Sequence, residues 1–260
     1  MDVLILPDTA GVARRAATAV VAGLRRRPGR NPVLGLATGS SPLGLYHELG
    51  RFSRSGDLDL SGASGFALDE YVGLPSGRPQ SYRQVLLAEV CAVTGLPPSR
   101  LHVPDASATQ LTALERAAAA YEGEIRAAGG VDVQVLGIGA NGHLGFNEPG
   151  SSLASRTRVK RLAERTRRDN ARFFERLEDV PTHCITQGLG TIVEARRLVL
   201  VATGAGKASA VAAALEGPLT ASCPASVLQW HPDAVVVLDD AAASGLRNRD
   251  YYDAAALGLS

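Results

Sequence analysis

The sequence contains few cysteines and no long uninterrupted apolar run. Its three cysteines are widely spaced and include no Cys-x-x-Cys pair, which argues against a disulfide framework and against a zinc site. We therefore expect reduced thiols in the core. No apolar stretch is long enough to span a bilayer, and the amino terminus has no signal-peptide core, so the sequence predicts a cytoplasmic protein without membrane association.

A strong charge of either sign is also absent. The formal net charge is +1 and the basic residues are dispersed, so we expect no nucleic-acid partner, although a small anionic substrate needs only local charge. All but two of the 27 basic residues are arginine, the exceptions being Lys160 and Lys207. Lysine could be kept there for its compact ammonium group, or both could be ordinary surface cations.

The chain of 260 residues is 45% hydrophobic, which is enough for one large α/β domain or two small ones. Apolar runs predict strands at Val3–Leu6, Val33–Ala37, Gly65–Leu68, Val131–Ile138, Arg197–Ala202 and Ala234–Leu238. Helical patterns occupy Ala10–Arg27, Pro42–Ser53, Ser81–Val93, Leu111–Ala128, Glu164–Leu177, Lys207–Leu215 and Arg249–Leu257. This alternation predicts a doubly wound, mostly parallel, Rossmann-like sheet with helices on both faces. Because no linker or repeat divides the chain, we expect one domain over residues 1–260.

The segment Asn141–Pro149 follows an apolar run and places His143 and Glu148 five residues apart on irregular backbone. Open α/β proteins bind small ligands at the carboxyl ends of their strands, so this segment is predicted to be a catalytic loop. The alternative is a tight turn in which both side chains only cap backbone groups.

The same stretch spells Gly137-x-Gly139-x-x-Gly142, the spacing of a dinucleotide-binding fingerprint. That fingerprint requires a helix to begin inside it, whereas Gly145 and Pro149 cannot continue one. No clear strand ending in an acid follows at the right distance. The sequence therefore argues against a nicotinamide enzyme.

Two glycine turns are candidate phosphate sites. In Thr38-Gly39-Ser40-Ser41-Pro42, backbone amides at a helix start favour an anion, although simple capping by a serine is the alternative. The second turn, 203–207, ends in Lys207 and resembles a P-loop only superficially. Position 201 is valine and position 208 is alanine, so the first glycine and the magnesium-binding hydroxyl are missing. Lys207 is thus expected to bind a substrate phosphate.

Two further segments carry charged groups. Asp69 and Glu70 end the predicted third strand, where a general base would lie, but in extended backbone only one of them can face a ligand while the other orients backbone. A satisfied surface pair is the alternative. The segment 151–162 alternates small polar, apolar and basic residues, which predicts an exposed extension or edge strand that either binds phosphate or is simply solvated.

Together these motifs resemble the glucosamine-6-phosphate deaminase family over nearly the whole chain, and the pairing of Asp-Glu-Tyr (69–71) with Asn-Gly-His…Phe-Asn-Glu-Pro (141–149) is highly specific. The resemblance implies conversion of D-glucosamine 6-phosphate and water to D-fructose 6-phosphate and ammonia, without cofactor or metal. It assigns ring opening to His143, oriented by Glu148 and Asn141, and proton abstraction at C2 to Asp69. Some family members carry aspartate in place of Asn141, so we expect a smaller rise in the histidine pKa here. By the same resemblance, the phosphate is bound by Thr38, Gly39, Ser40, Ser41, Arg172 and Lys207.

The resemblance extends to allosteric bacterial members, which look like hexamers activated by N-acetylglucosamine 6-phosphate. Their effector site matches Ser151, Arg158 and Lys160, with Tyr251 as the counterpart of a carboxyl-terminal tyrosine. Arg161 departs from the usual threonine, which leaves the affinity and selectivity for the effector open. We therefore expect a homo-oligomer, a hexamer by resemblance, that responds to this effector.

Three rival functions remain at this stage. A 6-phosphogluconolactonase has a similar fold but should lack both specific pairings, and an enzyme acting on galactosamine 6-phosphate would differ only in contacts to C4. A sugar-phosphate-sensing domain of a transcription regulator would need a DNA-binding segment, for which the first predicted strand, beginning at Val3, leaves no room. The presence of His143, Glu148 and Asp69 together also favours catalysis over sensing.

Overall fold

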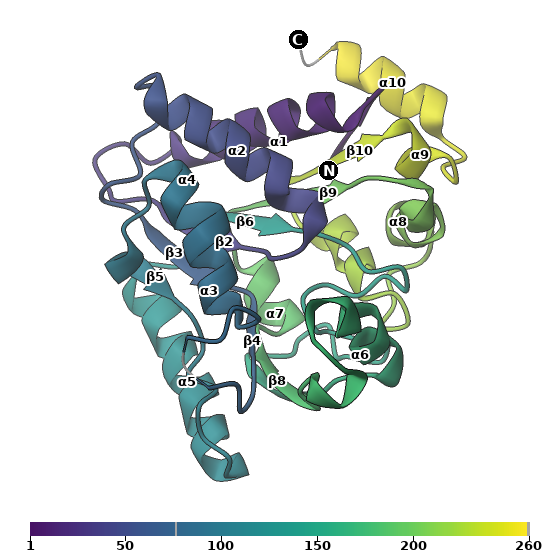
Figure 1. Cartoon of the computed structure of the whole chain (residues 1–260). Helices are drawn as coiled ribbons and strands as arrows, with labels where there is room; N and C mark the ends of the chain where they lie inside the picture. The colour runs from purple at the N-terminus through teal and green to yellow at the C-terminus, as the bar shows by residue number, and fades with distance from the viewer. Residues whose placement is uncertain (76, 259–260) are drawn as a thin grey trace.

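The unbroken apolar runs form a seven-stranded sheet whose neighbouring strands pair in parallel, in the order β1-β10-β9-β6-β2-β3-β5. β9 (Arg197–Ala202) and β10 (Ala234–Asp239) are buried at every position, as expected for strands covered on both faces. The computed structural model in Figure 1 describes residues 1–75 and 77–258. The remaining strands of this sheet are β1 (Asp2–Leu6), β2 (Val33–Leu36), β3 (Ser64–Ala67), β5 (Leu101–His102) and β6 (Val133–Leu136).

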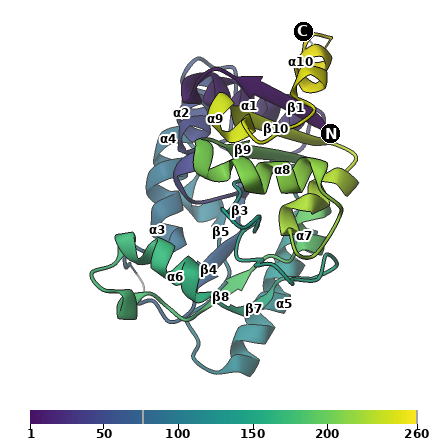
Figure 2. The ribbon, with the colours of Figure 1, turned by 90° about the vertical axis from the view of Figure 1, so that its right-hand side faces the viewer.

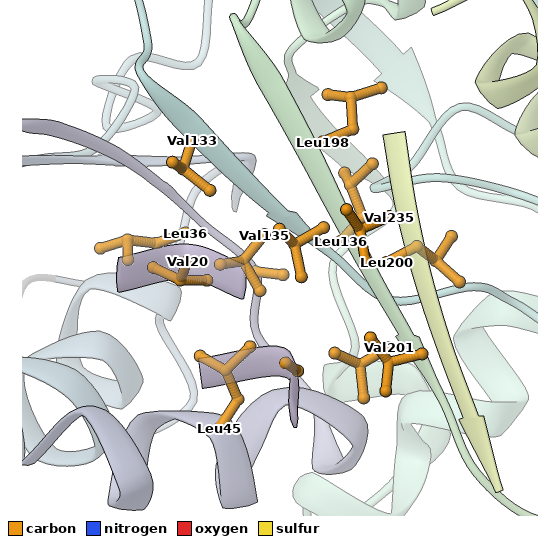
Figure 3. Close-up of a cluster of buried hydrophobic side chains, with 14 of the residues drawn as sticks. Val20, Leu36, Leu45, Val133, Val135, Leu136, Leu198, Leu200, Val201 and Val235 are labelled. Atoms are coloured by element: carbon orange, nitrogen blue, oxygen red, sulfur yellow. The ribbon is translucent and has the colours of Figure 1, made fainter. Parts of the chain in front are cut away.

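Helices cover both faces of the large sheet, with α2, α3 and α4 on one side and α7 and α8 on the other (Figure 2). The helices are α1 (Thr9–Leu24), α2 (Ser40–Arg54), α3 (Tyr82–Leu86), α4 (Ala92–Thr94), α5 (Leu111–Ala127), α6 (Glu164–Asn170), α7 (Leu189–Val193), α8 (Ala208–Glu216), α9 (Asp240–Ala243) and α10 (Arg249–Leu257). Figure 3 shows Val20 of α1 and Leu45 of α2 beside buried side chains of β2, β6 and β9. The predicted doubly wound α/β domain is therefore confirmed. Within residues 1–75 and 77–258, no helix is long and apolar enough to cross a bilayer.

A second, three-stranded antiparallel sheet was not predicted from the sequence. It consists of β4 (Asp69–Tyr71), β8 (His183–Thr186) and β7 (Arg158–Arg161), in the order β4-β8-β7. Strands of three or four residues are too short to show a clear hydrophobic period, which explains why β4 and β8 were missed. β7 confirms the edge strand expected within residues 151–162.

Two predicted helices differ from the observed ones. The single helix over Glu164–Leu177 was wrong, because α6 ends at Asn170 and is followed by a 3₁₀ turn at Ala171–Phe173 and extended backbone at Phe174. The second, Ser81–Val93, is interrupted by a π turn at Leu87–Cys91 between α3 and α4. Such turns change the direction of side chains without altering the apolar pattern, so the sequence does not reveal them.

The chain order of the sheet reverses between β2 and β6. From β2 the chain moves outward through β3 and β5, and from β6 it moves outward in the other direction through β9 and β10. At such a switch point the loops that follow neighbouring strands separate and leave a crevice at the carboxyl edge. The segments after β2, β3, β6 and β9 therefore meet at one place, and all four contain candidate functional residues.

Candidate active site

A cavity of about 340 Å³ opens at this switch point. Its walls come from the turn after β2, the start of β4, the loop after β6, the segment that contains α6, and the turn before α8. Among the residues predicted from the sequence, those that line the cavity are Thr38, Ser40, Ser41, Asp69, His143, Arg172 and Lys207. The structure thus brings most of the predicted catalytic and phosphate-binding residues into a single cavity.

Asp69 and Glu70 point to different surroundings, as predicted. Asp69 lines the cavity and is 4% exposed, and its pKa is raised to about 8, mainly by burial and further by the charge of Glu70. The carboxylate of Glu70 instead accepts hydrogen bonds from the backbone amides of Tyr71 (2.8 Å), Tyr82 (3.0 Å) and Arg83 (2.9 Å). Glu70 therefore orients the start of α3, and Asp69 is the acid available to a ligand.

A chain of hydrogen bonds orients the imidazole of His143. Asn141 Nδ2 donates to Glu148 Oε2 at 2.8 Å, which turns the amide oxygen Oδ1 toward His143 Nδ1 at 2.7 Å. Because an amide oxygen only accepts, this pattern assigns the proton to Nδ1 and leaves the Nε2 lone pair free. Thr166 Oγ1 donates to Glu148 Oε1 at the far end of the chain. The alternative in which His143 and Glu148 merely cap backbone groups is wrong.

The pKa of His143 is lowered, chiefly by burial and also by the positive charge of Lys207. The nearby carboxylate of Glu148, 3.8 Å from Nδ1, acts in the opposite direction. The sequence had suggested only that Asn141 would raise this pKa less than an aspartate would. In the structure burial outweighs the single carboxylate, so the imidazole is neutral near pH 7 and able to accept a proton.

The glycine at position 139 makes room for the imidazole. A β-carbon there would stand only 2.2 Å from His143 Cε1, and the backbone amide of Gly139 donates to the carbonyl oxygen of His143 at 3.0 Å. No helix begins between residues 137 and 150. Both findings agree with the rejection of a dinucleotide site.

The turn after β2 contributes Thr38, Ser40 and Ser41 to the cavity wall. Gly39, with a φ of 101°, occupies the N-cap of α2, and no side chain caps the helix there. Simple serine capping, the alternative considered above, is therefore wrong. Gly39 itself lies outside the lining of the cavity, whereas the side chains on either side of it, Thr38 and Ser40, line the wall. Uncapped amides at the positive end of a helix dipole favour a bound anion.

Lys207 and Arg172 contribute positive charge to this region. Lys207 Nζ donates to the carbonyl oxygen of Ile138 at 2.7 Å, which fixes the ammonium group beside the catalytic loop. Burial lowers the pKa of Lys207, and the charge of Arg172 lowers it further. Arg172 lies on the 3₁₀ turn after α6, with its guanidinium 4.7 Å from the ring centroid of Phe173. The early end of α6 is what places Arg172 on this turn.

Sequence reasoning missed several residues that line the cavity, namely Tyr82, Thr166, Asp169 and Asn170. Asn170 Nδ2 donates to the hydroxyl of Tyr71 at 2.8 Å, and the Tyr82 hydroxyl lies 3.3 Å from the same oxygen. These residues lie on α3 and α6, whose positions follow from tertiary packing. Hydrophobic periodicity gave no signal that either helix would face the catalytic loop.

The four predicted effector residues are not brought together within one chain. Ser151, Arg158 and Lys160 lie on or just before β7, whereas Tyr251 is 71% exposed on α10 at the opposite end of the molecule (Figures 1 and 2). The hydroxyl of Ser151 is buried and has no hydrogen-bond partner in the described part of the chain. Arg158 Nη1 donates to Asn147 Oδ1 at 2.8 Å, which links β7 to the catalytic loop.

Fold and site together define a class of protein. A doubly wound sheet, an anion site at a helix start and an acid–base pair in the same crevice are typical of α/β enzymes that act on small phosphorylated ligands. A family model described as "Glucosamine-6-phosphate isomerases/6-phosphogluconolactonase" matches residues 7–237. The chain belongs to this family.

Similar proteins place the chain near the deaminases of that family. It is 57% identical to the glucosamine-6-phosphate deaminase of Arthrobacter sp. (strain FB24) over 252 residues, covering 97% of this chain and 95% of the relative. It is 53% identical to the glucosamine-6-phosphate deaminase of Mycolicibacterium smegmatis over 253 residues, with the same coverage of 97% and 95%.

Solved structures confirm the fold. A monomeric glucosamine-6-phosphate deaminase superposes with a TM-score of 0.88 at 38% identity, covering 94% of this chain and all of the other. A 6-phosphogluconolactonase from Trypanosoma cruzi superposes with a TM-score of 0.75 at 19% identity, over 95% of this chain and 97% of that one. The second similarity shows a shared fold alone.

Proposed function

We propose that this protein converts D-glucosamine 6-phosphate and water to D-fructose 6-phosphate and ammonia. The observation that carries the proposal is a single cavity in which a buried carboxyl group, Asp69, and a neutral imidazole, His143, lie with an uncapped helix start and Lys207. The high identity to relatives named as glucosamine-6-phosphate deaminases supports the choice of substrate.

The first step is the opening of the pyranose ring. A proton must leave the anomeric hydroxyl and another must reach the ring oxygen, which breaks the C1–O5 bond and gives the aldehyde. His143 suits this shuttle because its Nε2 is unprotonated while Nδ1–H is held by Asn141. Glu148, hydrogen-bonded to Asn141, stabilises the imidazolium that forms transiently.

The second step moves a proton from C2 to C1. Asp69 as a carboxylate removes the C2 proton while the substrate's own ammonium group protonates the C1 oxygen, which gives an enolamine; Asp69 then returns its proton to C1, leaving a protonated imine at C2. Water adds to this imine, its oxygen becomes the ketone of fructose 6-phosphate, and ammonia departs. Because the pKa of Asp69 is about 8, we expect kcat/KM to rise with pH up to this range.

The phosphate group gives the ligand its position. Backbone amides at the start of α2, the hydroxyls of Thr38, Ser40 and Ser41, and the cations Arg172 and Lys207 together form a suitable anion site. Binding energy from this remote group would orient C1 and C2 against His143 and Asp69.

The direct test is ammonia and fructose 6-phosphate formation from glucosamine 6-phosphate by the purified protein. Galactosamine 6-phosphate and 6-phosphogluconolactone are assayed beside it, because a C4 epimer preference or lactonase activity would be the nearest alternatives. Equal amounts of ammonia and fructose 6-phosphate are expected. Rapid lactone hydrolysis without ammonia release from either amino sugar would overturn the proposal.

We also propose that Ser151, Arg158 and Lys160 bind N-acetylglucosamine 6-phosphate as an activator. Arg158 and Lys160 lie two residues apart on β7 and supply positive charge that suits a phosphate, and within residues 1–75 and 77–258 the buried hydroxyl of Ser151 has no hydrogen-bond partner. The bond from Arg158 to Asn147 offers a route to the catalytic loop. Because Tyr251 lies far away on α10, its participation requires a neighbouring subunit. The proposal therefore includes a homo-oligomer, a hexamer by resemblance. The proposed location is the cytoplasm.

Two measurements test the activator proposal. Light scattering gives the oligomeric state, and initial rates are recorded across substrate concentrations with and without N-acetylglucosamine 6-phosphate. An oligomer with a sigmoidal curve that the effector makes hyperbolic is expected. A monomer whose hyperbolic curve does not respond to the effector would refute both the oligomer and the activation, while leaving the deaminase proposal intact.

A further inference from the structure

The cavity contains an acid that the proposed chemistry does not use. Asp169 lies on α6, lines the cavity and is exposed at its mouth. Its carboxylate forms no ion pair or hydrogen bond within residues 1–75 and 77–258, whereas Glu164 of the same helix pairs with Arg168. Asp169 therefore faces the cavity as a negative charge that no direct hydrogen bond or ion pair engages.

The charge of Asp169 reaches both ends of the cavity. It opposes the lowering by burial of the pKa of Lys207, at the phosphate end, and of the pKa of His143, at the reacting end. A charge felt by both groups must lie where it can also act on a ligand placed between them. The effect is electrostatic and requires no direct contact.

A carboxylate is an unexpected neighbour for a phosphate site. It repels the phosphate group of any ligand and offsets part of the attraction from Arg172 and Lys207. Such a residue weakens binding of every sugar phosphate unless the preferred ligand carries a positive charge of its own. If the proposed function holds, the substrate does so, because glucosamine 6-phosphate has an ammonium group at C2.

The reaction removes this positive charge. The ammonium leaves as ammonia, so fructose 6-phosphate is more negative than the substrate by one unit. We infer that Asp169 is a specificity-determining residue that discriminates by charge, favouring amino-sugar phosphates over ammonia-free sugar phosphates and promoting release of the product. This inference rests on the proposed function and deepens it.

The test compares Asp169→Asn with the wild-type protein at pH 7. The quantity measured is the ratio of the inhibition constant of fructose 6-phosphate to the KM of glucosamine 6-phosphate. Loss of one unit charge across a partly hydrated cavity should lower this ratio about threefold. Asp169→Glu should retain the wild-type ratio. In 1 M KCl, where the screening length is about 3 Å, the difference between Asp169→Asn and wild type should largely vanish.

Glu175→Gln is the matched control, because Glu175 is an exposed acid on the neighbouring segment that does not line the cavity. It should leave the ratio unchanged. If Asp169→Asn changes the KM and the inhibition constant by the same factor, the residue acts on phosphate alone and the inference is wrong. If neither constant changes, the inference is also overturned.

Failure of the proposed function is distinguishable from failure of this inference. If the wild-type protein released no ammonia, the function would be refuted. The charge effect would then be measured from the dissociation constants of glucosamine 6-phosphate and glucose 6-phosphate, which differ only at C2. A ratio of these constants that Asp169→Asn leaves unaltered would refute the charge discrimination by itself.

Discussion

The cavity has two walls of different construction. One, which we call the sheet wall, is formed by segments at the carboxyl ends of strands and contains Asp69 and His143. The other, the α6 wall, consists of residues 164–174 and contains Asp169 and Arg172. Asp69 is 4% exposed and His143 is partly buried, whereas Asp169 and Arg172 are exposed. The two proposed catalytic side chains are thus shielded from solvent. The two side chains proposed to interact with the charges of the ligand are exposed to it.

Hydrogen bonding separates the walls in the same way. On the sheet wall, hydrogen bonds are buried, as where Asn147 donates to the carbonyl oxygens of Leu144 at 2.9 Å and Gln187 at 2.7 Å. On the α6 wall the pair Arg168–Glu164 is exposed at the surface, and such pairs contribute little to stability. Substitution of Asp69 or His143 should therefore change kcat, and substitution of Asp169 or Arg172 should change KM.

The largest effect is expected for Asp69→Asn. An amide cannot accept the C2 proton, so kcat should fall by about 10³ or more, in line with loss of a general base. Ammonia release measured at saturating substrate tests this. Retained ammonia release would show that the base has been assigned to the wrong residue.

Glu70→Gln is the adjacent control for that substitution. Within residues 1–75 and 77–258, Glu70 bonds only to backbone amides and does not line the cavity, so kcat should stay within about threefold of wild type. A loss of kcat as large as that of Asp69→Asn would mean that the two acids act as one unit.

Arg172→Ala should raise KM about 10- to 100-fold with a small change in kcat, because a charged hydrogen bond to phosphate is removed from the hydrated wall. Arg168→Ala is the matched control, since Arg168 lies on α6 but outside the cavity lining. Steady-state kinetics with both variants separates the two constants. A fall in kcat at unchanged KM would contradict the assignment of Arg172 to phosphate binding.

The dry environment of Asp69 should also appear in the pH dependence of stability. Its folded pKa of about 8 lies above the ordinary value of 3.8, so the folded protein binds this proton more tightly than the unfolded chain does. The resulting stabilisation is complete below pH 3.8 and is lost as pH rises toward 8. Asp69→Asn avoids this loss, so its unfolding free energy relative to that of the wild-type protein should grow by roughly 4 kcal/mol between pH 5 and pH 9. Urea unfolding at both pH values tests this, and a constant difference would contradict it.

The smallest effect is expected for Thr166→Val, which breaks a link between the walls. Thr166 lies on α6 and is 5% exposed, and its hydroxyl donates to Glu148 of the catalytic loop. Without this bond Glu148 holds Asn141 and His143 less firmly, so kcat should fall about three- to tenfold and the pH profile should shift. Thr166→Ser keeps the hydroxyl and should restore both. If serine fails to do so, packing of the methyl group is responsible instead.

The sequence predicted the sheet wall better than the α6 wall. Unbroken apolar runs such as β9 identify buried parallel strands, and motifs at their carboxyl ends then lie together as a consequence of topology. The α6 wall depends on where a helix stops. Nothing in the charged stretch around Arg172 distinguishes an α-helix from a 3₁₀ turn, so the predicted helix extends to Leu177 whereas α6 ends at Asn170. Asp169 was missed for the same reason, because the sequence does not show that this acid on a polar helix lines the same cavity as Lys207.

The slot that Gly139 leaves for His143 has a consequence for how short motifs are used. A glycine pattern indicates where another group must lie close to the backbone, but it does not identify that group. In a nicotinamide enzyme the group that lies against the glycine is the pyrophosphate of a bound cofactor, whereas here it is the imidazole of His143 from the same chain. Anyone grafting this loop onto another scaffold should therefore transfer glycine and histidine as one inseparable part.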